Sequence, residues 1–323
     1  MSTPFDWLAE RYTVSRRGLR WATTAAMVMA VVLIVGGGVV RVTGSGLGCP
    51  EWPMCTDESI TTTAEMGIHG IIEFGNRMLT WALSAAVGWA IIAARLQKPQ
   101  DRTITRLAWS QFWMVVLNAV IGGVTVWTGL NPYIVAGHFL AATALLTTTV
   151  LTWHRVRVAD FGKPEPVGPT SRVLGIGVLV STGLALAVGT LVTGSGPHSG
   201  DPDPVHRIPL NWTAITWFHG LLVAMVLALT VALLLSLRKS DTTARLRVLV
   251  FLGVLGLQGV IGIVQSLTDL PAVLVSLHLF GAALVWIGAL RVLLDTPLEK
   301  DPVLATTSAD PAPRPHSSPN VAR

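Results

Sequence analysis

Four histidines are the side chains in this sequence best suited to chemistry in an apolar setting: His69, His138, His219 and His278. Each lies in the outer third of a long apolar segment, and these segments are every second one along the chain. An imidazole in hydrocarbon must find a partner, so four at matching depth predict two pairs, each able to hold one planar metal cofactor such as haem from opposite sides. For any single histidine, a hydrogen bond between helices is the alternative.

The segment around His69 also carries a carboxylate and an amide. His69, Glu73 and Asn76 are spaced i, i+4 and i+7, so they share one helical face, and Arg77 follows directly. An ionised carboxylate next to hydrocarbon is costly unless it is paired or solvated, and such a group is a candidate proton acceptor. The alternative is that Glu73 and Arg77 form only a structural ion pair.

The composition indicates that a lipid bilayer is the main solvent of this chain. Charged residues make up 13% of the 323 residues and apolar residues 51%, whereas soluble domains usually carry about 25% charged residues. An all-α integral membrane protein is therefore expected. Stretches of about 20 apolar residues, the length that crosses a bilayer, predict eight transmembrane helices at 21–40, 69–94, 108–128, 133–153, 173–193, 212–237, 248–267 and 272–291.

The positions of lysine and arginine predict the orientation in the membrane. These residues gather before the first span and in the connections after the second, fourth and sixth spans, which places both termini in the cytoplasm. The net charge of +5 is then a topological signal, and no nucleic-acid partner is expected. The four histidines fall near the outer face of the cell membrane, and the Pro-, Ser- and Ala-rich end of the chain is expected to be disordered.

An internal repeat predicts two tandem four-helix bundles with the same orientation. Val120–Gly122 and His138 match Val260–Gly262 and His278 at an offset of 140, and a Thr-Gly-Ser-Gly sequence recurs at an offset of 150. The expected divisions are a cytoplasmic segment 1–20, a first half 21–155, a cytoplasmic linker 156–172, a second half 173–294 and a tail 295–323.

The repeat leaves the partner of His219 in the first half open. An offset of 150 aligns His69 with His219, whereas an offset of 143 aligns Asn76 with it. The two alignments differ by seven residues, two helical turns or about 10 Å of rise. The first half therefore has either a histidine or an asparagine at that position.

The two cysteines of the chain, Cys49 and Cys55, both fall in the first outer loop. A disulfide is chemically permitted on that side of the membrane, and a redox-active thiol pair is the alternative. The sequence around them is not Cys-x-x-Cys-His, so any haem is expected to be held without a covalent bond to the chain.

Several of these motifs together resemble the haem A synthase family, also called cytochrome aa3 controlling or Cox15-like proteins. The resemblance is carried by Arg-Val-Thr-Gly-Ser-Gly-Leu-Gly-Cys-Pro-Glu-Trp-Pro-Met-Cys (41–55), Ile-Glu-Phe-Gly-Asn-Arg (72–77), Gly137-His138, Phe218-His219 and Leu277-His278. It covers roughly residues 20–292. The cysteine loop and the Glu73 segment are fairly specific, whereas the isolated histidines are not.

The resemblance implies an enzyme that oxidises the C8 methyl group of haem O to a formyl group, giving haem A for terminal oxidases. It implies haem b in the second half, with His219 and His278 as axial ligands. In the first half it implies the substrate haem, with His138 as one ligand and Glu73 as the catalytic carboxylate, and His69, Asn76 and Arg77 as further candidates at that site. It also implies a Cys49–Cys55 disulfide. Expected partners are haem O synthase (protohaem farnesyltransferase), the oxidase assembly machinery and an unidentified electron acceptor.

The chain departs from the family pattern at one ligand position. The family usually has Glu-x-x-His-Arg, whereas Asn76 stands here in place of the histidine, and an amide is a poor iron ligand. Either His69 takes over, or His138 holds the substrate iron from one side alone. Three rival functions remain: a di-haem electron-transfer cytochrome of b type, a transporter and a non-catalytic assembly factor.

Overall fold

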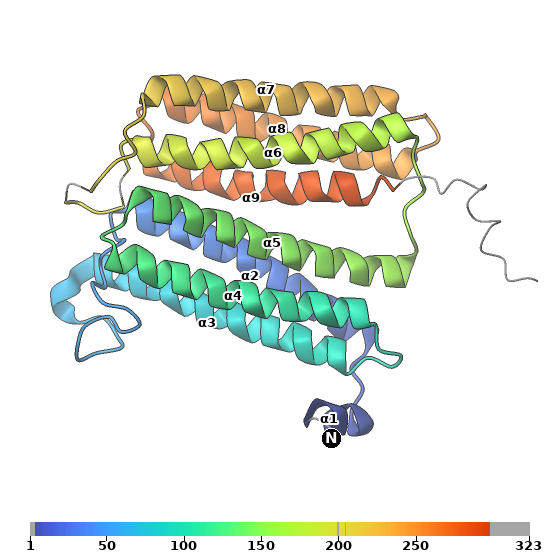
Figure 1. Ribbon diagram of the computed structural model, residues 1–323, viewed down its shortest axis with the longest axis horizontal. Helices are drawn as coiled ribbons and strands as arrows, with labels where there is room; N and C mark the ends of the chain where they lie inside the picture. Colours follow the sequence, from blue (N-terminus) through green and yellow to red (C-terminus); the bar gives the residue numbers. More distant parts are fainter. Residues whose placement is uncertain (1–3, 199, 204, 298–323) are drawn as a thin grey trace, which may run out of the picture.

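Eight long apolar helices lying side by side form the body of the protein (Figure 1). The computed structural model describes residues 4–198, 200–203 and 205–297, so all but the first three residues of the predicted disordered tail, 295–323, lie outside the described residues. All eight helices are long and apolar enough to cross a membrane, which confirms the predicted fold class. They are α2 (Arg16–Val42), α3 (Gly67–Arg95), α4 (Arg102–Trp127), α5 (Pro132–Phe161), α6 (Pro169–Ser195), α7 (Trp212–Ser236), α8 (Thr242–Leu267) and α9 (Ala272–Leu294).

Polar residues next to the apolar runs determine where several helices begin. Ser15 accepts a hydrogen bond from the Gly18 N–H at the start of α2, and Asn211 does the same for Ala214 at the start of α7. Asn131 caps α5, whose first residue is a proline, as the N1 position favours. Two short helices were not predicted: α1 (Pro4–Arg11) and the 3-10 helix η1 (Ala64–Met66).

The helices pack as two groups of four with the same order of neighbours. In the first group α2 contacts α3 and α5, and α4 contacts α3 and α5; in the second, α6 contacts α7 and α9, and α8 contacts α7 and α9. Alternate helices of a group, such as α3 and α5 or α7 and α9, therefore face each other diagonally. The equivalence of the halves as a sequence repeat, and the domain boundaries, stay predictions.

The two groups meet mainly through α9, which packs against α2 and α5. Trp286 Nε1 of α9 donates to Thr147 Oγ1 of α5 at 2.8 Å. Beyond the end of α9, the buried Asp295 carboxylate accepts from His154 Nε2 of α5 at 2.9 Å and from Arg247 of α8 at 3.0 Å. Burial alone would raise the pKa of Asp295, but these contacts and Arg291 hold it below its ordinary value.

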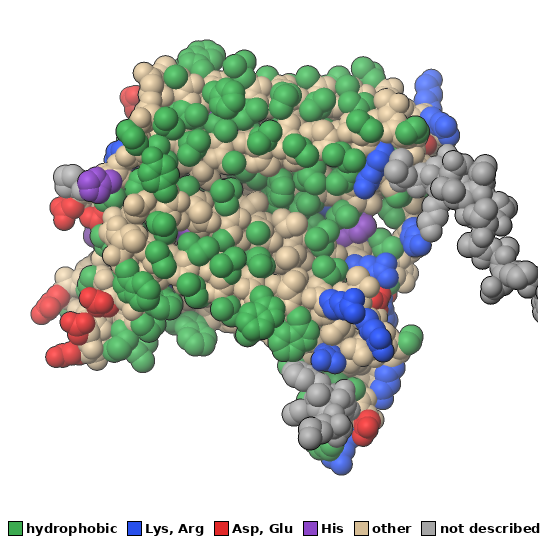
Figure 2. Space-filling model, in the orientation of Figure 1, with side chains coloured by type: hydrophobic (Ala, Val, Ile, Leu, Met, Phe, Trp, Pro, Cys, Tyr) green, Lys and Arg blue, Asp and Glu red, His purple; other side chains and the backbone are tan. Residues whose placement is uncertain are grey.

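Charge and hydrophobicity divide the surface along the helix axes. Figure 2 shows hydrophobic side chains over the middle of the helices, and lysine and arginine gathered at the end where α1 lies. The described ends of the chain, α1 and the residues after α9, both lie at that basic end (Figure 1). Which side of the membrane this end faces stays a prediction, made from the positive charges.

Candidate functional site

The second group of helices brings its two histidines toward each other across the bundle. His219 lies on α7 and His278 on the diagonally opposite α9, and the two rings are close enough to interact electrostatically. His219 Nδ1 lies 3.0 Å from the carbonyl oxygen of Ala185. Because a carbonyl only accepts, Nδ1 carries the proton, and Nε2 is left with its lone pair. His278 Nδ1 is buried without a hydrogen-bond partner among the described residues.

A glycine on the preceding helix lies against each of these rings. A methyl group built on Gly189 of α6 would lie 3.3 Å from His219 Cε1, and one built on Gly262 of α8 would lie 3.1 Å from His278 Cε1. Side chains larger than glycine would take the space beside the imidazoles. The two glycines therefore provide flat surfaces that allow the rings to lie close to neighbouring backbone.

The first group repeats this arrangement with one histidine and one asparagine. His138 of α5 lies against Gly122 of α4, where an added methyl would be 3.3 Å from Cε1. Asn76 of α3 lies against Gly36 of α2, where an added methyl would be 2.5 Å from Oδ1. Asn76 Oδ1 and His138 Nδ1 are both buried without partners among the described residues. Asn76 lies against a glycine of α2 as His219 lies against a glycine of α6, so Asn76 corresponds to His219 of the second group.

His69 lies elsewhere, against the first outer loop. Its Nδ1 is 3.0 Å from Oγ of the fully buried Ser45, and its backbone carbonyl lies against Gly48. The histidine is therefore engaged by the loop two helical turns from Asn76. Asn76, and not His69, therefore lies against a glycine of the preceding helix, as His138 does.

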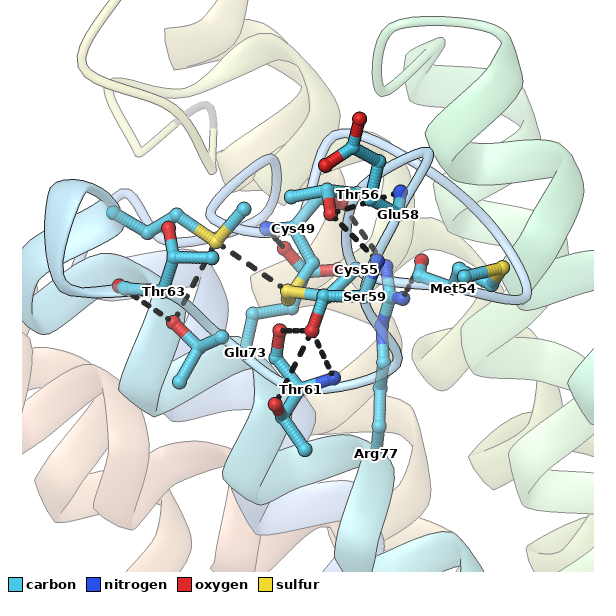
Figure 3. The surroundings of a disulfide bond; sticks show 12 residues. Cys49, Met54, Cys55, Thr56, Glu58, Ser59, Thr61, Thr63, Glu73 and Arg77 are labelled. Carbon is cyan, nitrogen blue, oxygen red and sulfur yellow. Dashed lines mark hydrogen bonds and ion pairs between the residues drawn. A yellow bond between two sulfur atoms is a disulfide. The ribbon is translucent and has the colours of Figure 1, made fainter.

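Glu73 and Arg77 fasten the same loop to α3 (Figure 3). The Cys49 N–H donates to Glu73 Oε2 at 2.6 Å, and Arg77 Nη2 donates to Glu73 Oε1 at 2.7 Å. Arg77 also donates to the carbonyl oxygens of Cys49 at 3.0 Å and Met54 at 2.7 Å. Glu73 is only 6% exposed. The structural ion pair expected as an alternative is therefore present, and it anchors the loop.

The loop itself is closed by a disulfide and covers part of the first group. Cys49 and Cys55, both fully buried, form the expected disulfide. Between them, Trp52 packs edge-on against Trp127 of α4 with ring centroids 5.3 Å apart, and its ring lies against Gly123. The Glu73 carboxylate, the Arg77 guanidinium, the disulfide and the Trp52 indole together hold the loop over the start of α3 and the end of α4.

Two amides, on the helices that carry the glycines facing the His138 and His278 rings, were not among the predicted site residues. Asn118 of α4 is 5% exposed and donates to the Met114 carbonyl at 2.8 Å, while its Oδ1 has no partner among the described residues. Gln258 of α8 donates to the His278 carbonyl at 2.8 Å and likewise leaves its oxygen unpartnered. The sequence repeat could have indicated both amides. Asn118 and Gln258 are 140 residues apart, as His138 and His278 are, and each lies four residues before the glycine that faces a histidine ring.

An arginine joins the outer loops of the two groups. Arg41, at the end of α2, donates to the Thr193 carbonyl at 2.9 Å and to the His198 carbonyl at 3.1 Å. The Gly46 N–H donates to the Gly200 carbonyl at 2.7 Å. The His198 ring also takes part in loop packing, since its Nε2 lies 2.9 Å from the carbonyl oxygen of Leu270.

Comparison with known proteins places these features in one family. The family model described as cytochrome oxidase assembly protein, COX15-CtaA, matches residues 20–290. Proteins named heme A synthase are similar: one from Lysinibacillus sphaericus is 30% identical over 45% of this chain and 48% of its own length. One from Symbiobacterium thermophilum is 32% identical over 54% and 58%, and one from Listeria monocytogenes is 33% identical over 37% and 39%.

The matched region thus spans about half the length of these relatives. The family match is broader, since it runs from the first apolar helix almost to the end of the last and includes every residue of the candidate site. This chain therefore belongs to the COX15-CtaA family of cytochrome oxidase assembly proteins.

Proposed function

We propose that this chain has haem A synthase activity and oxidises the C8 methyl group of haem O to a formyl group, giving haem A. The observation that supports this proposal most directly is that the two groups of helices differ in their facing side chains. One has facing imidazoles, and the other has a single imidazole opposite an amide, next to a carboxylate. The names of the similar proteins agree with this activity.

The residues of the second group fit a resident haem b. His219 and His278 lie diagonally opposite, each beside a glycine, and the protonated Nδ1 of His219 leaves Nε2 free to act as a ligand. The unpartnered Nδ1 of His278 is consistent with a ring held in place for a ligand. His219 and His278 would hold haem b, which would supply electron transfer when bound.

The first group fits a haem that enters as substrate and leaves as product. His138 would bind its iron, while the amide of Asn76 would leave the opposite side without a strong ligand. Glu73, about one turn before Asn76 on α3, would accept a proton from the reacting methyl group. A carboxylate has about four acceptor sites, so the contacts with Cys49 and Arg77 leave capacity for a proton.

Partners and location follow from the same proposal. Haem O synthase would supply the substrate, the oxidase assembly machinery would receive the product, and an electron acceptor not yet identified would remove the electrons. Lipid surrounds the helices, and no nucleic acid takes part. We place the chain in the cell membrane with both termini in the cytoplasm, because lysine and arginine gather at the end of the bundle where α1 and the residues after α9 lie.

Haem extraction and mass analysis test this function. Membranes of a host that makes haem O but lacks haem A should contain a formyl-bearing haem only when they contain this chain. Glu73→Gln should retain bound haem and stop conversion, while the matched variant Glu65→Gln, an exposed acid in the same region, should convert normally. Unchanged haem O in the presence of folded, haem-loaded protein would exclude the synthase and favour the electron-transfer cytochrome.

A further inference from the structure

A basic pocket lies at the opposite end of the first group, far from the candidate haem sites. It has a volume of about 540 Å³ and lies between the end of α3 and the start of α4. Its lining includes three arginines, an amide and two indoles: Arg95, Arg102, Arg106, Gln100, Trp109 and Trp113. No acidic side chain lines it.

The arginines on α4 are placed where charge alone would disfavour them. Arg102 and Arg106 are the first and fifth residues of the helix, so two like charges lie one turn apart at its positive end. Neither makes an ion pair or side-chain hydrogen bond within the described part of the chain. A bound anion would remove both the mutual repulsion and the unfavourable interaction with the helix dipole.

Asp101, which directly precedes Arg102 in the sequence, does not neutralise this pocket. Asp101 uses Oδ1 to cap α4, accepting from the Thr103 N–H at 2.8 Å and the Ile104 N–H at 3.2 Å. Its Oδ2 pairs with Arg155 of α5 at 3.2 Å. Together these contacts outweigh the effect of burial and hold the pKa of Asp101 below its ordinary value. The Asp101 carboxylate is therefore engaged by the first N–H groups of α4 and by Arg155 of α5, and not by Arg102 or Arg106.

One stripe of α4 changes from charged to aromatic to aliphatic along the helix. Arg102, Arg106, Trp109 and Trp113 are spaced i, i+4, i+7 and i+11 over about 16 Å of rise. Val120 continues the stripe, and Trp113 and Val120 are 62% and 50% exposed. A phospholipid has the same order of groups: an anionic phosphate, a polar-apolar boundary and hydrocarbon chains. Tryptophan is typical of that boundary.

We propose that this pocket binds the headgroup of an anionic phospholipid, with the phosphate between Arg102 and Arg106 and an acyl chain along Trp113 and Val120. Basic pockets between transmembrane helices are suited to such headgroups. A soluble anion would satisfy the arginines but would make no use of the indole and aliphatic surface that follows them. The proposal does not depend on the proposed enzyme activity.

Native mass spectrometry of the delipidated full chain tests the proposal. Dioleoyl phosphatidylglycerol should bind at least tenfold more tightly than dioleoyl phosphatidylcholine. Combined Arg102→Gln and Arg106→Gln should weaken phosphatidylglycerol binding roughly 30-fold, from about fivefold per arginine. Arg102→Lys with Arg106→Lys keeps the charges and should retain most of the binding, which separates loss of charge from misfolding.

The second group of helices offers a matched control. Arg238 and Lys239 are exposed residues in the connection between α7 and α8, at the same end of the bundle, and they do not line the basic pocket. Arg238→Gln with Lys239→Gln should leave lipid binding unchanged. Equal binding of the two lipids, an equal loss in this control, or binding of inorganic phosphate as tight as that of phosphatidylglycerol would overturn the proposal.

Discussion

Replacing Glu73 by glutamine should loosen the first outer loop. The carboxylate accepts two charge-assisted hydrogen bonds, from Cys49 and Arg77, each of which contributes about 1.5–3 kcal/mol. Glutamine has one carbonyl oxygen, so it can keep one of these bonds in a weaker, neutral form and loses the other. Arg77 lies on α3 together with Glu73, so only the bond from Cys49 joins this carboxylate to the loop. Its loss should lower the free energy for opening the loop by about 1.5–3 kcal/mol, or roughly 10- to 100-fold in the opening equilibrium.

Hydrogen–deuterium exchange of the full chain in lipid nanodiscs measures this opening directly. Peptides covering residues 47–56 should exchange roughly 10- to 100-fold faster in Glu73→Gln than in the unaltered chain, and the disulfide should keep the loop from dissociating entirely. Glu65→Gln is the control and should leave exchange unchanged. If the loop remains equally protected without the carboxylate, Glu73 does not fasten it, and the contacts in Figure 3 do not determine its stability.

A second variant separates the loop contact from the proposed proton transfer. Arg77→Gln removes three hydrogen bonds to the loop and to Glu73 but keeps the carboxylate. It should open the loop as Glu73→Gln does, yet retain haem conversion above the background of Glu73→Gln. If both variants lose conversion completely, loop opening alone explains the loss, and the proton-acceptor role of Glu73 is not needed.

Three further substitutions test other parts of the structure. Asn76→His should place an imidazole opposite His138 and raise the haem content of the purified chain, an increase that His138→Ala should abolish in reduced-minus-oxidised spectra. Asn118→Leu removes a buried unpartnered oxygen that costs about 1–3 kcal/mol, so the thermal midpoint should stay equal or rise, while conversion should fall if the amide contacts substrate. The pKa of Asp295 in the folded chain is below its ordinary value of 3.8, so the ionised carboxylate stabilises the fold above pH 3.8. This stabilisation is lost as the pH falls from 3.8 through the folded pKa. The thermal midpoint of Asp295→Asn should therefore fall less steeply below about pH 4 than that of the unaltered chain.

The sequence was sufficient to predict the helices because the bilayer imposes a strong rule on composition. Each of the eight apolar runs corresponds to one observed helix, and most helices extend a few residues past the predicted span into charged or capping positions. The eight-residue α1 could not be found this way, since a short helix depends on packing and leaves little periodicity. The disulfide followed from two cysteines in one loop together with the resemblance.

The candidate site was harder to predict because the two halves have unequal loops. Offsets of 143 and 150 aligned different residues with His219, and neither could be preferred from one sequence. The structure separates them through long-range contacts: Gly36 lies against Asn76 as Gly189 lies against His219, although 36 and 189 differ by 153. Likewise, no local pattern indicates that His154 and Asp295, which are 141 residues apart, join the halves.

The amide at Asn76 and the loop closed by the disulfide both suit a site that a haem must enter and leave. A haem that stays needs two strong ligands and a closed site, whereas a haem that must enter, react and leave needs weaker ligation and an opening. The four glycine-flanked positions differ in ligand type at one residue only, Asn76, and the helix that carries Asn76 also carries the pair that fastens the loop. If exchange depends on this asymmetry, Asn76→His should slow release of haem from the first site more than any substitution at the loop, because it adds an iron ligand instead of a hydrogen bond. Equal release rates in the unaltered chain and Asn76→His would show that the missing imidazole does not control exchange.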